Sequence, residues 1–236
     1  MKDERAQAFV AGWTAAAGTG EGRLEERHLA AADPRLGRLI ARLVAGGGMR
    51  RFKPSTAPSD FDAIARSIVY QQLSTMAAST IYGRYVEALG GSPNPERVLE
   101  ARPERLLRAG LSRAKVRYVK ALASAVASGE LDLGSLRDLP DESVIDALTR
   151  VPGVGLWTAQ MFLMFRLHRP DVLPTIDVGI RRGLQMAHGL RKPAAPGYVS
   201  RSGRRWAPYR SLACLYLWAA LEPGTVGPDQ APASAD

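Results

Sequence analysis

Apolar residues along this chain recur mostly three and four positions apart, which is the spacing of one face of an α-helix. Between residues 24 and 44 they predict short amphipathic helices interrupted at Asp33-Pro34. Ser59 is suited to cap a longer helix that carries apolar residues on one face through Val69. The sequence shows no sustained alternation of apolar and polar residues bounded by hairpin turns. The pattern therefore predicts an all-α protein.

The remaining helices are predicted from capping residues, from glycines that end helices and from apolar periodicity between them. One of these helices is expected to end at Leu89, and another is expected to begin at Asn94. The others are expected from Ser112 to Gly129, from Asp141 to Thr149, from Gly155 to Leu167, from Asp177 to Met186 and from Pro208 to Leu221. A basic loop, Arg191 to Trp206, is expected between the last two. Residues 1–24 form a polar extension that we expect to be only partly ordered. Residues 223–236 have the composition of a disordered tail.

The composition is that of a globular protein, with 236 residues of which 46% are hydrophobic and 23% charged. The longest apolar run, Leu212 to Leu221, is half as long as the ~20 residues that a membrane span needs. The first residues lack the apolar core of a secretory signal, so we expect a cytoplasmic protein. A single cysteine, Cys214, excludes an internal disulfide and any four-cysteine cluster within the chain.

The charge balance points to a polyanionic partner. Lys and Arg number 32 against 23 Asp and Glu, which gives a net charge of +9. Most of the positive residues are arginines, whose planar guanidinium groups bind phosphate at two points. This favours nucleic acid over a membrane surface, although many basic proteins bind no polyanion in particular.

The segment Val151-Pro152-Gly153-Val154-Gly155 lies between two predicted helices. Glycines on both sides of one residue allow a tight turn, and the helix that follows begins with unpaired backbone N–H groups. Such a turn presents several amides and a helix N-terminus to one phosphate, independently of base sequence. The alternative interpretation is a tight turn between two helices in which the glycines only relieve strain.

Four motifs, in order along the chain, extend this observation: Ser67 to Ser74 (SIVYQQLS), Gly110 to Lys115 (GLSRAK), Asp171 to Pro174 followed by Asp177, and Trp206 to Ser211 (WAPYRS). With the glycine turn they resemble the helix-hairpin-helix (HhH-GPD) DNA glycosylases. Within that superfamily they are most similar to the 3-methyladenine DNA glycosylase II (AlkA-like) family. The resemblance covers roughly residues 25–222, in a compact form without the N-terminal β-rich domain of longer members.

The resemblance implies a two-lobed helical domain at 25–222 that brackets a cleft, with a helix-hairpin-helix motif at about 141–168. It also implies a monomeric enzyme that flips an alkylated purine out of double-stranded DNA and hydrolyses its N-glycosidic bond. Asp177 is then the catalytic carboxylate, which stabilises the oxocarbenium-like sugar and positions water. The alternative role for Asp177 is that of a helix cap alone.

Further site residues are implied by the same resemblance. The flipped base is expected to meet Trp218, Trp157, Met161 and Tyr70. DNA contacts are expected from Gln71, Gln72, Gly153, Val154, Gly155, Thr158, Arg181 and Arg210, with Gln72 filling the gap left by the base. The backbone carbonyls of Thr149, Val151 and Val154 are expected to hold a structural Na⁺ or K⁺. For Trp218 a core position, and for the two glutamines a buried link between helices, are the alternatives.

Three departures from relatives bear on activity. Trp157 stands where strand-cleaving relatives carry a Schiff-base lysine, so we expect no lyase step. The lone Cys214 cannot support the iron–sulfur cluster of other relatives. Met161 stands where longer members have a second stacking aromatic residue, which leaves the preferred lesion open. A glycosylase for deaminated, oxidised or mismatched bases, and a non-catalytic DNA-structure binder, are the competing hypotheses.

Overall fold

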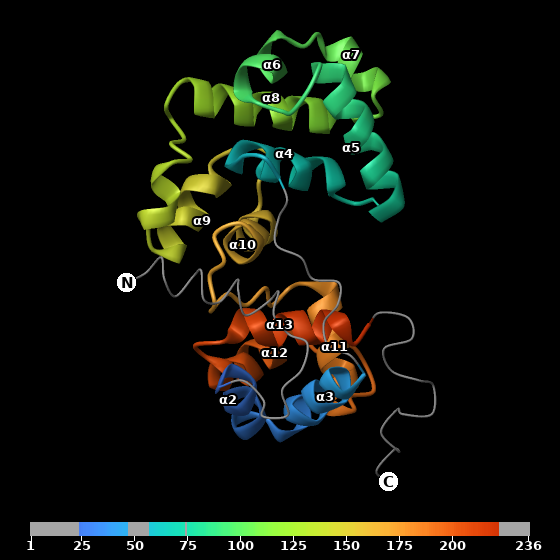
Figure 1. Ribbon diagram of the computed structural model, residues 1–236, viewed down its shortest axis with the longest axis vertical. Coiled ribbons are helices and arrows are strands. Elements are labelled where there is room, and N and C mark those ends of the chain that lie inside the picture. Colours follow the sequence, from blue (N-terminus) through green and yellow to red (C-terminus); the bar gives the residue numbers. More distant parts are fainter. Residues whose placement is uncertain (1–23, 47–56, 74, 222–236) are drawn as a thin grey trace. The chain divides into compact units, whose positions relative to one another are not determined.

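The computed structural model describes residues 24–46, 57–73 and 75–221 (Figure 1). Every regular element in these ranges is a helix, which confirms the all-α prediction for the described part of the chain. Apart from Leu24, the predicted extension at 1–24 and the predicted tail at 223–236 lie outside the described residues. The contacts divide the described chain into two compact units. Unit 1 combines 24–46 with 168–221, and unit 2 is the stretch 57–167.

Unit 1 is built from both ends of the described chain. Its elements are α2 (Leu24–Ala32), α3 (Pro34–Ala45), α11 (Val178–His188), α12 (Pro196–Gly203), η2 (Arg204–Trp206) and α13 (Arg210–Ala219). Figure 1 shows α3 packed beside α11 and α13, and α2 lies against η2. Each residue from Ser211 to Leu217 is buried, so α13 forms the centre of this unit.

Asp33, at the break between α2 and α3, joins the two sequence segments of unit 1. Its buried carboxylate caps α3 at the N–H of Leu36, with a distance of 3.2 Å. The same side chain accepts the indole N–H of Trp206 at 3.1 Å and lies 3.0 Å from Nε2 of His188. The other ring nitrogen of His188 lies 2.9 Å from the hydroxyl of Tyr198. The predicted break at Asp33-Pro34 is therefore also a polar connection inside unit 1.

The prediction of a basic loop at Arg191 to Trp206 was wrong, because α12 and η2 occupy much of it. Pro196 stands in the first turn of α12, where proline is well tolerated. Only Val199 and Trp206 supply large buried apolar side chains in this stretch. Two such residues among several arginines give too weak a periodicity to predict a helix.

Unit 2 is a continuous stretch of helices. It contains α4 (Asp60–Tyr70), α5 (Thr75–Leu89), α6 (Pro95–Glu100), α7 (Pro103–Arg108), α8 (Arg113–Ala127), η1 (Ser135–Asp138), α9 (Asp141–Thr149) and α10 (Leu156–Phe165). In Figure 1, α8 runs alongside α4 and α6, and it also contacts α7. α10 packs on α9 and α4. The short α7 was not predicted, because only Leu106 of its six residues is buried.

The capping predictions for unit 2 are confirmed. Ser59, Asn94 and Ser112 each accept the backbone N–H three residues further on with their side chains. Each such cap stabilises its helix by about 1 kcal/mol. α10 ends at Phe165, two residues before the predicted end. None of the described helices is long and apolar enough to cross a membrane.

Candidate active site

Asp177 is the N-cap of α11, and it also contacts a tryptophan. Its Oδ1 accepts the backbone N–H of Ile180 at 2.8 Å. The same oxygen accepts the indole N–H of Trp218, also at 2.8 Å. The residues Pro174 to Asp177 form the turn that leads into α11, with the N–H of Asp177 bonded to the carbonyl of Pro174. The two N–H donors thus fix the direction in which the carboxylate points.

Trp218 is only partly buried, whereas its neighbours on α13 are buried. Its indole lies against the first turn of α11, where Gly179 leaves room for it. A Cβ on Gly179 would come within 2.6 Å of the indole carbon Cδ1. The core position considered for Trp218 does not account for its partial exposure or for its hydrogen bond to Asp177.

Gly183, one turn beyond Gly179, brings α11 against the backbone of α13. A Cβ at this position would lie 2.3 Å from the carbonyl oxygen of Leu217. The spacing glycine-x-x-x-glycine therefore lets two helices approach more closely than any larger residue would permit. Sequence reasoning missed this pair, although the GxxxG spacing in Gly179 to Gly183 was visible.

The two predicted arginines of unit 1 are engaged within the protein. Nε of Arg181 donates to the carbonyl of Ala194 at 2.7 Å. Arg210 binds both carboxylate oxygens of Asp171, at 2.6 and 2.8 Å. Contacts between these arginines and DNA stay a prediction, and Arg210 would have to share its guanidinium with Asp171.

The predicted hairpin turn lies between α9 and α10 in unit 2. The N–H of Val154 bonds to the carbonyl of Val151 at 3.0 Å, which closes the turn. Gly153 has φ +88°, and its missing Cβ leaves room for the ring of Tyr118, which would otherwise be 2.1 Å away. Gly155 has extended backbone at φ −93°, and a Cβ there would meet open space. Only the first glycine is therefore required by the turn itself.

The two predicted glutamines have different surroundings. Nε2 of Gln71 donates to the carbonyl of Gly153 at 2.9 Å and to the hydroxyl of Thr158 at 3.3 Å. Gln71 is thus a link between two segments, as the alternative proposed. Thr158 is buried beside this link, so it offers almost no surface to DNA, and its predicted DNA contact stays a prediction. Gln72 is exposed and has a left-handed backbone, with φ +58°.

Three predicted base-binding residues lie in unit 2. Trp157 is 38% exposed at the start of α10, whereas Met161, one turn later, is only 8% exposed. The hydroxyl of Tyr70 accepts a hydrogen bond from Arg66 at 3.3 Å, and the guanidinium carbon of Arg66 lies 5.1 Å from the centre of the Tyr70 ring. Trp157 therefore presents far more surface to a base than Met161 does.

A buried carboxyl behind Tyr70 escaped sequence reasoning. Asp62 is 1% exposed and accepts the hydroxyl of Tyr82. Burial raises the pKa of Asp62, while Tyr82 and the charge of Arg66 act in the opposite direction. Arg66 lies over the rings of both Tyr70 and Tyr82, so the cluster that orients Tyr70 combines residues of α4 with Tyr82 of α5. A polar residue on the apolar face of that helix was the available signal.

The carbonyls predicted to hold a monovalent cation come from one short segment. Thr149 is the last residue of α9, and Val151 and Val154 belong to the turn that follows. Carbonyl oxygens are hard ligands suited to Na⁺ or K⁺, and the C-terminal end of a helix carries partial negative charge. The donor set fits such an ion, and its binding stays a prediction.

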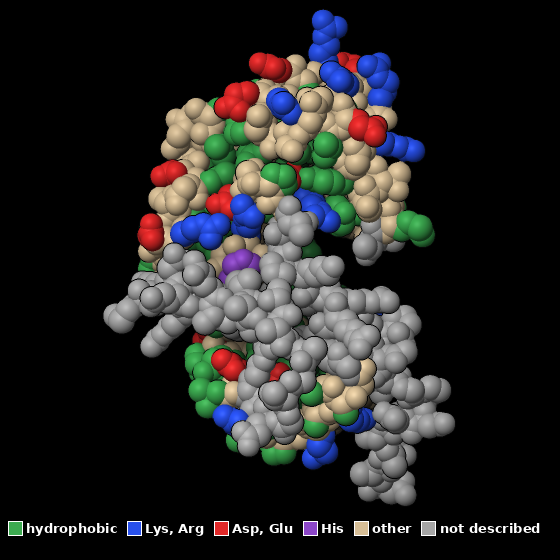
Figure 2. Space-filling model, in the orientation of Figure 1, with side chains coloured by type: hydrophobic (Ala, Val, Ile, Leu, Met, Phe, Trp, Pro, Cys, Tyr) green, Lys and Arg blue, Asp and Glu red, His purple; other side chains and the backbone are tan. Residues whose placement is uncertain are grey.

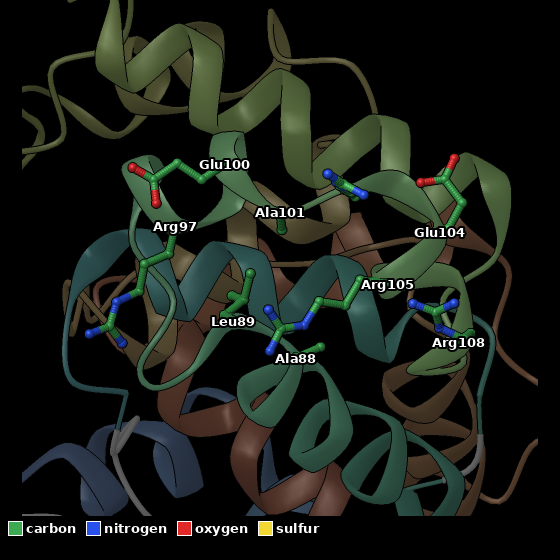
Figure 3. A pocket seen from close by; sticks show the side chains of 9 residues that line it. Ala88, Leu89, Arg97, Glu100, Ala101, Glu104, Arg105 and Arg108 are labelled. Carbon is green, nitrogen blue, oxygen red and sulfur yellow. The ribbon is translucent and has the colours of Figure 1, made fainter.

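A pocket of about 660 Å³ in unit 2 has none of the predicted site residues in its lining. Figure 3 shows the side chains that line it. Its charged lining comes from α6, α7 and the connection between them, and consists of Arg97, Arg102, Arg105, Arg108, Glu100 and Glu104. Figure 2 shows positive and negative side chains interspersed over this part of unit 2. The pocket therefore presents no single sign of charge to a ligand.

Known proteins share the family that the motifs indicated. Residues 65–208 match the pattern of the family described as "HhH-GPD superfamily base excision DNA repair protein". The chain is 33% identical over 196 residues to DNA-3-methyladenine glycosylase 1 of Schizosaccharomyces pombe, which covers 82% of this chain and 85% of that protein. It is 31% identical over 171 residues to a putative DNA-3-methyladenine glycosylase of Bacillus subtilis, covering 70% of this chain and 60% of that protein.

Solved structures that resemble this chain also include 3-methyladenine glycosylases. A DNA-3-methyladenine glycosidase from Bacillus halodurans superposes with a TM-score of 0.72 at 38% identity, over 84% of this chain and 89% of that one. The S. pombe 3-methyladenine DNA glycosylase, solved in complex with abasic DNA, gives a TM-score of 0.78 at 30% identity, over 87% of this chain and 100% of that one. An 8-oxoguanine glycosylase/lyase from Clostridium acetobutylicum, at 15% identity, shares the fold, with a TM-score of 0.67.

Proposed function

Because this chain belongs to the HhH-GPD superfamily of base excision DNA repair proteins, we propose that it is a DNA glycosylase for alkylated purines. Its substrate is double-stranded DNA carrying 3-methyladenine or a related cationic base. The observation that carries the proposal is the carboxylate of Asp177, fixed by the N–H groups of Ile180 and Trp218. A protein that only binds DNA could cap α11 equally well with a neutral Asn or Ser, which would not repel phosphate.

The reaction is hydrolysis of the bond between C1′ of the sugar and N9 of the purine. The electron pair of this bond leaves with the base, and water adds its oxygen to C1′. Alkylation at N3 or N7 places positive charge on the purine, so the base leaves readily without strong acid catalysis. Asp177 stabilises the positive charge that develops on the sugar, and it positions or deprotonates the water.

Recognition of the base rests on aromatic faces. An indole attracts a cationic purine more strongly than a neutral one, by about 1–2 kcal/mol once water is excluded. Trp218, beside Asp177, and the exposed Trp157 are the residues proposed for this role. Tyr70 adds a third ring, and the buried Met161 contributes less.

The hairpin turn binds the DNA backbone in this proposal. The amide of Val154 is used inside the turn, so the amides of Gly155 and of the first turn of α10 are the ones that face a phosphate. A Na⁺ or K⁺ on the carbonyls of Thr149, Val151 and Val154 would add positive charge there. Trp157 offers no amine for a Schiff base, so the enzyme leaves an abasic site and does not cut the strand. The protein acts as a monomer.

The experiment that tests the proposal is a base-release assay on several duplexes. Methylated DNA, hypoxanthine, 8-oxoguanine and mismatched duplexes are incubated with the protein, and released bases are separated by chromatography. Release of 3-methyladenine above the other bases supports the proposal. Selective release of a deaminated or oxidised base would identify a different glycosylase, and binding without any release would identify a DNA-structure binder.

A further inference from the structure

Lys115, on α8, binds the segment that carries the two glutamines. Its Nζ donates to the carbonyl oxygens of Val69 at 2.7 Å and Gln71 at 2.9 Å. The ammonium group is partly buried, and this desolvation lowers the pKa of Lys115. The lysine therefore serves a contact inside the protein, although a surface lysine of a DNA-binding protein would ordinarily be assigned to phosphate.

The geometry of the loop explains why this contact is needed. α4 ends at Tyr70, and its last carbonyls have no intrahelical partners. The chain then turns through Gln72, whose φ of +58° is uncommon for a residue with a side chain. Lys115 binds carbonyls on both sides of the point where the helix ends, so it fixes the direction in which the exposed Gln72 projects.

The same helix supports the hairpin. Tyr118, one turn after Lys115 on α8, has its ring against Gly153. Gln71 joins the two supported segments through its hydrogen bond to the carbonyl of Gly153. The glutamine loop and the hairpin are thus held by one face of α8 and linked to each other.

We propose that Lys115 is a positioning residue for base flipping. It holds the loop so that Gln72 enters the DNA stack in register with the phosphates bound by the hairpin. This inference rests on the proposed function, because it assigns Lys115 to the flipping step of that reaction. Misplacement of such a group by about 1 Å is enough to cost up to a hundredfold in rate.

Lys120 supplies a matched control on the same helix. Its Nζ also donates to two carbonyls, those of Val98 and Leu99, each at 3.1 Å. These carbonyls belong to α6, which carries none of the residues predicted to contact DNA. Lys115→Met and Lys120→Met therefore remove the same kind of contact and the same charge, at two different places.

The test compares the two variants by single-turnover release of 3-methyladenine from methylated duplex DNA and by thermal unfolding. A second readout uses an abasic duplex with 2-aminopurine opposite the gap, whose fluorescence reports disturbed stacking without any catalysis. We expect Lys115→Met to lose roughly 10- to 100-fold in release and most of the fluorescence change. Lys120→Met should stay within about twofold of wild type in both assays.

Two further variants keep the proposal open to refutation. Gln71→Leu should show the same selective loss, and Lys115→Met added to Gln72→Ala should cost little beyond Gln72→Ala alone. The proposal is overturned if Lys115→Met loses no more than Lys120→Met, or if the losses at Lys115 and Gln72 simply multiply. A wild-type protein that releases no base, yet shows the fluorescence change, would refute the proposed function and leave the role of Lys115 standing.

Discussion

Asp177 uses one oxygen for two N–H donors, those of the α11 backbone and of the Trp218 indole. Asparagine caps helices about as well as aspartate, and its side-chain oxygen accepts the same two bonds. Replacing Asp177 with Asn therefore removes the negative charge and little else. This substitution therefore tests the negative charge of Asp177 separately from its role as a helix cap.

We expect Asp177→Asn to fold with a melting temperature close to that of wild type and to lose at least about a hundredfold in single-turnover release of 3-methyladenine. A loss of this size corresponds to roughly 3 kcal/mol of transition-state stabilisation. Affinity for abasic-site DNA should be kept or improved, because a charge near phosphates is gone. Release within a few-fold of wild type would reduce Asp177 to a helix cap.

The aromatic face of Trp218 and its indole N–H can also be tested separately. Trp218→Ala removes the aromatic face, and we expect it to reduce release of cationic 3-methyladenine by about tenfold more than release of neutral hypoxanthine, if the latter occurs at all. Trp218→Phe keeps an aromatic face and removes the N–H that Asp177 accepts, so its loss should be similar on both bases. Equal losses on both bases for the alanine variant would return Trp218 to a purely structural role.

In the hairpin turn, one glycine is required by the backbone conformation, and the other can be changed to test DNA binding. Gly153 needs its left-handed backbone and the space taken by Tyr118, whereas Gly155 has ordinary backbone and open space beside it. The structure thus allows a side chain to be added at Gly155 without refolding the turn. A change there reports on what approaches the turn from outside.

We expect Gly155→Asp to fold normally and to weaken binding of abasic duplexes of any base sequence by roughly tenfold or more, because it adds a carboxylate where phosphate approaches. Fluorescence anisotropy with several duplexes measures this effect. Gly155→Asn is the uncharged control and should weaken binding less. Unchanged affinity in the aspartate variant would contradict the assignment of the hairpin to DNA.

Asp33 connects elements from the two sequence segments of unit 1, and its ionisation affects the stability of that unit. Burial alone would raise the pKa of Asp33. The contacts with His188, together with the N–H groups of Leu36 and Trp206, outweigh burial and lower the pKa to about 2 from the ordinary 3.8. The folded protein therefore holds the ionised form more strongly than the unfolded chain does.

The sign of the pH dependence follows from this shift. The stabilisation is fully present above about pH 3.8 and is lost as the pH falls toward 2, with a size of about 2 kcal/mol. We expect Asp33→Asn to be less stable than wild type at pH 7 and to show a flatter decline in melting temperature between pH 4 and pH 2. Parallel declines in the two proteins would rule out this carboxylate as the cause.

For the molecule as a whole, local signals predicted the helices well. Ser59, Asn94 and Ser112 cap helices where expected, because a cap involves neighbours three residues apart. The sequence could not show contacts that the fold makes between distant positions. Lys115 reaches carbonyls 44 and 46 residues away, and Trp218 reaches Asp177 across 41 residues. The resemblance supplied the roles of Asp177 and Trp218, but not the bond between them.

Unit 2 is one continuous stretch of chain, whereas unit 1 needs residues from both sides of it. This arrangement sets an order of events during synthesis. Asp33 leaves the ribosome 155 residues before its partner His188, which at about 5–20 residues per second is a delay on the order of ten seconds. During that time α3 lacks its partners α11 and α13, and α2 lacks its partner η2. Unit 1, which holds Asp177, is thus completed after unit 2.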